Sequence, residues 1–520
     1  MKDGKKRSFW RAWHKWVGLF FSIFIMLFCF SGIILNHRHF FSSAEVSRQW
    51  LPKAYHIENW NQSVVQGTFR MEDGSLLAYG QAGIWKTDST FSSWTEFNDG
   101  IRKGIDNRKI SNIVRTSDGN LWCAGLYDAY TLKDGIWSPV ILEGNRERIS
   151  DITTKDGSDL VVLTRSKVYT AKAPDYRFTE ITLLRPEGYE QKVTLFKTFW
   201  MIHSGEIFGI VGKLIVDAMA VILIILCITG IVFFVLSASV RRQGRKIPAM
   251  SPEQASATRE NMKKKAGRIK NNLRLHNSLG SSAIILTLIL SVTGMCLRPP
   301  LMIPLAITKV SPIPGSTLAD KNVFHDKLRS IRWDEVEDRW LLSTSEGFYS
   351  IGENIENSLP EAISPSPTVS PMGINVFARN PEKPQEWLVG SFSGLFSWNI
   401  STGEVTDWFT GEKPERGSYG VTGSHSVTGW TEDLGVKPVV FDYYSAPNAD
   451  IAEMPEILSR QKMSLWNFAL ELHVGRCYER FLGSILSVLF VFLSGAILTL
   501  VLLSGYILYR KSKRTNKSKN

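Results

Sequence analysis

Four long apolar segments restrict this 520-residue chain more than any other feature of its sequence. They cover about residues 16–35, 206–236, 279–297 and 481–509. Each segment is long enough to cross a hydrocarbon layer of about 30 Å as a helix. Because a segment in lipid must satisfy its backbone hydrogen bonds internally, we predict four transmembrane helices.

Lys and Arg are concentrated in three short segments that flank the apolar ones. Residues 1–15, 238–275 and 510–520 hold six, eleven and six Lys or Arg against one, two and no acids. These three segments together carry +20, and because the whole chain carries +12, the rest of the chain carries −8. Cytoplasmic connections are enriched in Lys and Arg, so both termini and the 238–275 connection are expected inside. The positive charge then indicates orientation and lipid contact, and no nucleic-acid binding is expected.

The apolar segments form two related pairs. The frame H-x3-G-x12-[ST]-G occurs at His14 and again, 262 residues later, at His276. The frame L-[FW]-x5-[IL]-H-x-G precedes the second and fourth apolar segments and contains His203 and His473. We therefore predict a tandem repeat of two helical pairs, with a β-rich region inserted after each odd helix.

The two outer regions, about 37–205 and 298–472, contain short strand-like runs separated by turns. Runs that begin at Asp73, Asp118 and Asp156 are 45 and 38 residues apart, and runs that begin at Arg339 and Glu386 are 47 apart. A period of about 40–50 residues built from short strands is typical of propeller blades. We expect one propeller-like domain formed from both outer regions, with two smaller β domains as the alternative.

The expected fold is a membrane bundle of four transmembrane helices plus this β-rich domain. The expected parts are a basic inner N-terminus (1–15), the first span (16–36), the first β-rich region (37–200), the second span (201–238), a basic inner loop (239–275), the third span (276–298), the second β-rich region (299–464), the fourth span with a leading helix (465–509) and a basic inner tail (510–520).

Four histidines lie at repeat-related ends of the predicted spans. His14 and His276 are expected at the inner face, and His203 and His473 near the outer face. Facing imidazoles on neighbouring helices are what axial ligation of a haem requires, so we predict one haem between each pair. The alternative is that these histidines contact lipid headgroups.

Glycines one turn after the inner histidines offer room for a bulky ring. Gly18 and Gly280 stand four residues after His14 and His276, and glycine lets another group approach the backbone closely. Ser31-Gly32 and Thr293-Gly294, at the other ends of the same segments, indicate close helix packing.

The second and fourth apolar helices present a problem of length. From each outer histidine to the basic flank is 38 residues, or about 57 Å of straight helix, which exceeds the bilayer. The helices either project outward or bend, near Gly209 or Gly212 in one and near Gly483 in the other. If the outer pair lies above the membrane, His37 becomes a rival outer ligand.

Three charged residues near the spans are further candidates. Lys213 and Asp217 are four residues apart, so they could pair on one helix face and serve a proton or a haem propionate. Arg298, just after the third apolar segment, is a candidate propionate partner. The alternative for each is a boundary charge that reaches the headgroups.

These frames resemble the PepSY-associated transmembrane family, the iron-regulated membrane proteins of bacteria. The residues that carry the resemblance are Trp13-His14 with Gly18 and Ser31-Gly32, His203-Ser204-Gly205-Glu206, Leu275-His276 with Gly280 and Thr293-Gly294, and Leu472-His473-Val474-Gly475. The resemblance implies a four-helix bundle and, in some relatives, two b-type haems and reduction of ferric siderophores at the periplasmic face. Here β repeats occupy the place of a PepSY segment.

Two functional hypotheses follow. The first is a haem-dependent electron-transfer protein of the bacterial inner membrane, possessing two large periplasmic loops and reducing a ferric chelate. Its electron donor, a quinol or a soluble reductase, must be external because the inner connections are too short for a flavin or nicotinamide domain and lack a dinucleotide fingerprint. The second is a non-enzymatic protein that binds or senses a periplasmic partner protein through its β-rich domain.

Overall fold

The computed structural model describes residues 2–58, 60, 64–368, 370, 373–414, 425–435, 437–444 and 451–517. The chain forms two compact units. The helical unit comprises Met1–Arg38, Gln191–Ala319 and Trp466–Asn520, and the β unit comprises His39–Glu190 and Asp320–Leu465. Both β-rich regions of the sequence therefore lie in one unit.

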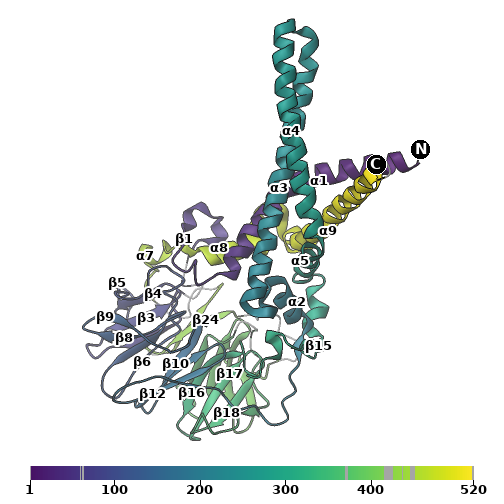
Figure 1. Cartoon of the computed structure of the whole chain (residues 1–520). Helices are drawn as coiled ribbons and strands as arrows, with labels where there is room; N and C mark the ends of the chain where they lie inside the picture. The colour runs from purple at the N-terminus through teal and green to yellow at the C-terminus, as the bar shows by residue number, and fades with distance from the viewer. Residues whose placement is uncertain are drawn as a thin grey trace. The chain divides into compact units, whose positions relative to one another are not determined.

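The helical unit is built from long helices joined by short turns (Figure 1). Its elements are α1 (Lys2–Asn36), β14 (Val193–Thr194), α2 (Leu195–Ser204), η3 (Glu206–Phe208), α3 (Gly209–Lys246), η4 (Ile247–Ala249), α4 (Pro252–Ser282), α5 (Ile284–Cys296), α6 (Met302–Ile307), β15 (Lys309–Val310), η5 (Thr317–Ala319), α8 (Leu465–His473), η6 (Arg476–Tyr478) and α9 (Glu479–Lys517). Helix α1 packs against α3 and α9, α3 packs against α4, and α5 packs against α9.

Among the described residues, three helical stretches are long and apolar enough to cross a membrane, by length and composition: Phe9–Asn36, Glu206–Ala249 and Arg476–Lys511. A fourth exists if the bent pair α4 and α5 forms one span. These two helices meet at an angle of 66°. The hydroxyls of Ser281 and Ser282 donate to carbonyls of the preceding turn, a contact that bends helices. The predicted third span is therefore broken rather than straight.

Glycines break the second and fourth apolar segments close to their histidines. Gly205 and Gly475, which end the two H-x-G motifs, have φ of 78° and 81°. Gly209 and Gly483 follow with φ of 60° and 76°. Only glycine adopts such angles at little cost, so α2 and α8 are short helices set off from the spans. The bends expected near Gly209 and Gly483 are present, whereas Gly212 is helical.

The basic connection expected as a loop over 239–275 is mostly helical. Helix α3 continues to Lys246, and α4 begins after Ser251, whose side chain forms a capping box with Gln254. One face of α4 repeats with alternating spacings of three and four residues and is less exposed than the residues between: Ala255, Thr258, Met262, Lys265, Ile269, Asn272, His276 and Leu279. This spacing is typical of a coiled-coil seam, and α3 and α4 lie side by side as a hairpin (Figure 1).

The β unit contains six successive antiparallel sheets among the described residues, in each of which consecutive strands pair. The first three are β2 (Gly67–Arg70), β3 (Leu76–Gly80), β4 (Gly83–Thr87) and β5 (Trp94–Glu96); β6 (Asn112–Arg115), β7 (Leu121–Ala124), β8 (Ala129–Lys133) and β9 (Ile136–Val140); and β10 (Ile149–Lys155), β11 (Asp159–Thr164), β12 (Val168–Lys172) and β13 (Thr179–Ile181).

The other three sheets come from the second β-rich region. They are β16 (Leu328–Asp334), β17 (Arg339–Thr344), β18 (Phe348–Gly352) and β19 (Glu361–Ile363); β20 (Val376–Arg379), β21 (Trp387–Ser391), β22 (Gly394–Asn399) and β23 (Glu404–Asp407); and the two-stranded β24 (Val427–Thr431) and β25 (Val439–Asp442). The pair β1 (Glu45–Val46) and β26 (Met463–Ser464) and the short helices η1 (Arg48–Trp50), η2 (Lys53–Tyr55) and α7 (Glu456–Ser459) complete the unit.

Neighbouring sheets share buried apolar cores. Leu77 of the first sheet packs in one cluster with Tyr130 of the second, and Val161 of the third packs with Leu342 of the fourth. The predicted Asp-Gly turns lie between the first and second strands of the first three sheets, where Gly74, Gly119 and Gly157 have positive φ. Each Asp-Gly turn therefore joins the first two strands of one sheet.

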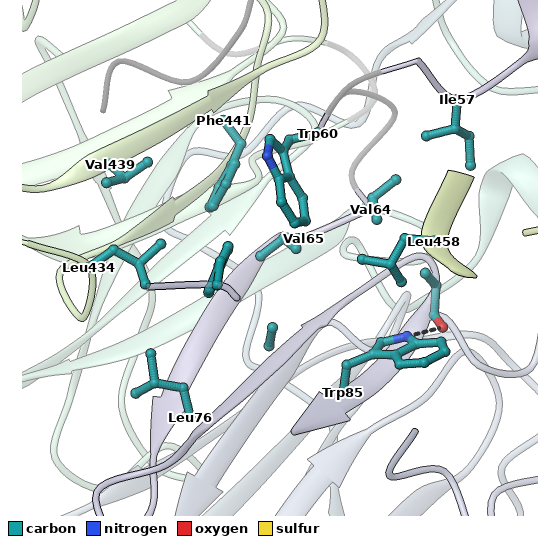
Figure 2. Packing of buried hydrophobic residues seen from close by; sticks show 13 residues of the cluster. Ile57, Trp60, Val64, Val65, Leu76, Trp85, Leu434, Val439, Phe441 and Leu458 are labelled. Carbon is teal, nitrogen blue, oxygen red and sulfur yellow. Dashed lines mark hydrogen bonds between the residues drawn. The ribbon is translucent and has the colours of Figure 1, made fainter. Parts of the chain in front are cut away.

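The sixth sheet packs against the first. Phe441 and Val439 of β25 lie in one buried cluster with Leu76 and Trp85 of the first sheet (Figure 2). The backbone N–H of Trp430 in β24 also donates to the carbonyl of Gln66, 3.0 Å away. The succession of sheets thus returns to its starting point, although the sixth sheet comes from the far end of the sequence.

Candidate functional site: two facing pairs of histidines

The structure brings the four predicted histidines together in two pairs. The rings of His14 in α1 and His276 in α4 have centroids 6.3 Å apart and planes inclined by 80°. The rings of His203 in α2 and His473 in α8 have centroids 6.1 Å apart and planes inclined by 56°. Each pair thus joins one histidine from each copy of the repeat.

In the outer pair, Nδ1 of each ring bonds to a hydroxyl on a neighbouring helix. His473 Nδ1 lies 2.9 Å from Ser31 Oγ in α1. His203 Nδ1 lies 3.2 Å from Thr293 Oγ1 in α5 and 3.1 Å from the carbonyl of Leu290. The Ser-Gly and Thr-Gly pairs, expected only to mark close packing, therefore hold the outer histidines.

The inner pair is held in the same way by α3 and α9. His276 Nδ1 lies 2.8 Å from Thr229 Oγ1, and His14 Nδ1 lies 3.2 Å from Ser504 Oγ and 3.0 Å from the carbonyl of Val501. Our sequence analysis did not identify Thr229-Gly230 and Ser504-Gly505. The signal was available, because the [ST]-G dipeptide of the odd spans recurs inside the even spans.

Two of the four dipeptide glycines lie so close to a ring that a side chain would collide with it, whereas a Cβ on Gly32 would lie 3.4 Å from His473 and one on Gly230 4.0 Å from His276. A Cβ on Gly294 would lie 2.7 Å from Cε1 of His203, and one on Gly505 would lie 2.7 Å from Cε1 of His14. By contrast, a Cβ on Gly18 would lie 3.7 Å from Val501, which is an ordinary packing distance. For the histidine rings themselves, room depends on Gly294 and Gly505, and the role expected of Gly18 and Gly280 toward a bulky ring stays a prediction.

The hydrogen bonds determine which nitrogen of each ring carries the proton. The hydroxyls of Ser31, Thr229 and Thr293 each donate to a carbonyl of their own helix at 2.7 Å, and that of Ser504 donates at 2.8 Å. A hydroxyl has one proton, so each must accept from the imidazole Nδ1–H. In a neutral ring this leaves Nε2 with a free lone pair, which is the form that binds a metal.

The separation within each pair fits a shared metal. Two imidazoles bonded through nitrogen on opposite sides of one metal, at about 2 Å each, place their ring centroids roughly 6.4 Å apart. The observed 6.3 and 6.1 Å agree with this value. No group of three or more His, Cys, Asp or Glu side chains suits a metal ion within the described part of the chain. Haem needs only two ligands from the protein, and each histidine pair offers two.

The remaining candidates near the spans have other partners. His37 Nε2 lies 2.6 Å from Asp217 Oδ2, so this nitrogen is occupied. Asn36 donates to Asp217 Oδ1 at 3.4 Å. Lys213 pairs with Glu206 at 3.0 Å rather than with Asp217. The structure therefore does not bring His37 to the outer pair, and it does not pair Lys213 with Asp217.

Arg298 follows α5 and is half-buried. Its Nε is buried without a hydrogen-bond partner among the described residues, whereas the nearby Arg476 pairs with Glu471. An unpaired buried guanidinium donor suits a carboxylate such as a haem propionate.

A small cavity of the β unit lies near η1 and η2. Its volume is about 230 Å³, and its lining includes Arg48, His56 and Arg460. Burial lowers the pKa of Arg48, whose guanidinium donates to the carbonyls of Gln461 and Tyr55. Pockets for small molecules usually measure about 300–1,000 Å³, so we assign no substrate to this cavity.

Solved structures resemble the chain only at low identity and low TM-score. No curated protein matches the chain. The extracellular domain of a hybrid two-component system from B. thetaiotaomicron is similar at 10% identity and a TM-score of 0.36, over 77% of this chain and 32% of that one. The YCF48 protein from Cyanidioschyzon merolae is similar at 10% identity and a TM-score of 0.33, over 78% and 89%. The chain thus spans about a third of the first of these structures.

A family model provides the clearest match. The model described as PepSY-associated TM region matches residues 1–236, which include His14, His203, the Ser31-Gly32 pair and the Thr229-Gly230 pair. The expected resemblance is confirmed: residues 1–236 of the chain match the PepSY-associated transmembrane region.

Proposed function

We propose that this protein is a haem-binding electron-transfer protein of the bacterial inner membrane that reduces a ferric chelate, such as a siderophore, at the periplasmic face. One observation carries the proposal. Two pairs of imidazoles face each other at the spacing of shared ligation, and every Nε2 has a free lone pair.

A haem b in each pair would supply reversible one-electron chemistry. Because both axial positions would be filled, the site suits electron transfer rather than oxygen chemistry. The protein orients each ring through the Nδ1–H bond to Ser31, Thr229, Thr293 or Ser504, which also increases the basicity of Nε2. Arg298 would hold a propionate.

We assign the β unit to the periplasm and infer that its six sheets form a six-bladed propeller. The packing of the sixth sheet on the first supports a closed ring. The basic flanks support an inner location for both termini. The electron donor would be a quinol or a soluble reductase, and the ferric chelate would meet the β unit or a periplasmic partner protein.

The visible spectrum of the purified protein, oxidised and reduced, tests this proposal directly. We expect a low-spin b-type haem spectrum and about two haems per chain. His56→Ala, a change in the β unit, is the control and should leave the spectrum unchanged. Protein expressed with ample haem that shows no haem absorption would overturn the proposal.

The alternative is a non-enzymatic protein that binds a periplasmic partner through the β unit. The closed succession of sheets favours it, because such units commonly serve as binding surfaces. In that case the double change His14→Ala and His276→Ala would leave the biological function intact.

A further inference from the structure

The hairpin of α3 and α4 has a row of exposed cations with no role in the proposed electron path. Arg259, Lys263, Lys270 and Arg274 of α4 form this basic row. All four are exposed, and no ion pair joins any of them to the described residues. Lys264, beside the row, pairs with Glu260 at 3.0 Å.

The spacing places the row on one face of α4. Steps of four, seven and four residues keep the four side chains within roughly 60° around the helix. The seam residues Ala255, Met262 and Ile269 are less exposed and pack toward α3. The row therefore points away from α3, along about 22 Å of helix.

The direction of the hairpin favours a protein over a membrane surface. Helix α3 runs without a break from Gly209 to Lys246 and includes its own membrane-spanning stretch. The hairpin cannot lie flat on the bilayer while α3 remains straight, so the basic row follows the direction of the span. A headgroup layer is only about 5–7 Å thick on each side, so lipid could meet only a fraction of the row.

The row ends at the inner histidine pair. Arg274 lies two residues before His276, whose ring faces His14. Residues 238–275 contain eleven Lys or Arg and two acids, so this region attracts and orients acidic surfaces. A partner bound along the row would have one end beside the inner pair.

We propose that the basic row is the docking surface for a soluble, acidic electron-carrying protein, such as one with a reduced flavin or an iron–sulfur cluster. The proposal rests on the proposed electron-transfer function and specifies its donor. In each encounter the carrier loses one electron, and the inner site gains it without bond formation or proton transfer.

The test uses the full-length protein in nanodiscs of zwitterionic lipid, with chemically reduced flavodoxin as the acidic probe. Two quantities are measured at low and high salt: binding of flavodoxin, and the rate of haem reduction by flavodoxin. For the wild-type protein we expect both to fall as salt rises. The variant R259E/K263E/K270E/R274E should lose about tenfold or more in rate and in affinity at low salt.

The matched control K2E/K5E/K6E/R7E makes the same change in charge at the N-terminus and should change the rate less than twofold. Helical content by circular dichroism checks that both variants fold. Equal losses in the two variants, or no loss in the row variant, would overturn the proposal. The test is repeated in nanodiscs that contain phosphatidylglycerol. If the row variant differs from the wild type only in these nanodiscs, the row binds lipid and the proposal is overturned. Absence of haem would overturn the proposed function instead, while the binding measurement would still test the row.

Discussion

At the scale of single residues, the site consists of one repeated contact. A histidine from one helix places Nδ1 on a Ser or Thr hydroxyl of another helix, and at Gly294 and Gly505 the glycine beside that hydroxyl makes room for the ring. The contact fixes the position of the ring and the nitrogen that bears its proton. The histidines could be predicted from the repeated frames, but their hydroxyl partners could not, because Ser and Thr are common where apolar helices pack.

The space beside each ring leads to the first prediction. Gly294→Ala places a methyl 2.7 Å from Cε1 of His203, so the ring must move, and under the proposed function the outer pair should bind much less haem. Gly18→Ala is the matched control, because its methyl meets Val501 at 3.7 Å. Haem content per chain distinguishes the two variants. Equal haem content in both would contradict the role assigned to Gly294.

The hydroxyl at Thr229 leads to a second prediction. Thr229→Val keeps the shape of the side chain but removes the acceptor for His276 Nδ1–H, so haem affinity at the inner pair should fall about 10–100-fold. Thr229→Ser retains the oxygen and should bind nearly as well as the wild type. Titration of the haem-free protein with haem measures both affinities, and a weak Ser variant would show that shape matters more than the hydrogen bond.

The hydrogen bond between His37 and Asp217 leads to a third prediction. Asp217 accepts bonds from His37 and Asn36, and its side chain is 16% exposed. Asp217→Ala removes the partner of His37 Nε2 and the weaker of two acceptors of Asn36, which also donates to the carbonyl of Ser204 at 3.1 Å. The change should destabilise the helical unit by about 1–3 kcal/mol. Lys264→Ala, which removes an exposed ion pair on α4, is the control and should have little effect. Thermal unfolding in detergent compares them.

At the scale of elements, the sequence predicted the spans better than their breaks. Apolar length identifies a span reliably, because lipid imposes one strong condition on composition. The separation of α2 and α8 depends instead on the φ angles of Gly205 and Gly475, and glycine is also common inside spans. The helical hairpin could have been predicted from its heptad spacing, but the high density of charge suggested a loop.

The seam of α4 leads to a fourth prediction. Ile269 faces α3 seven residues before His276, so Ile269→Asn should loosen the hairpin and reduce haem at the inner pair while the outer pair keeps its haem. Lys270→Asn, one residue later on the exposed face, should leave both haems in place. Redox titration of the two haems reads out each site, and loss of both haems from the Ile269 variant would indicate general unfolding.

At the scale of the whole molecule, the period of about 40–50 residues predicted repeated sheets but not how they close. The spacing of the turns predicts the number of residues per sheet, because each Asp-Gly pair forms the turn of the first hairpin in one sheet. The packing of the sixth sheet on the first depends on residues far apart in the sequence, such as Phe441 and Leu76, and such contacts leave no local pattern.

The contact between the sixth and first sheets leads to a fifth prediction. Phe441 is fully buried, so Phe441→Ala should destabilise the β unit by about 3–5 kcal/mol. Phe40→Ala, at a side chain that is 80% exposed in the same unit, is the control and should have little effect. Hydrogen exchange should show faster exchange in both β2–β5 and β24–β25. Faster exchange in β24–β25 alone would argue against a shared core.

The pairing of the histidines has a consequence for the ancestry of the chain. His14 and His203 belong to the first copy of the repeat and contact hydroxyls of the second copy, whereas His276 and His473 belong to the second copy and contact hydroxyls of the first. Neither copy could complete either site alone. A half-length ancestor with one copy could have formed both sites only as a twofold-symmetric homodimer, and gene fusion would then have freed each half to diverge.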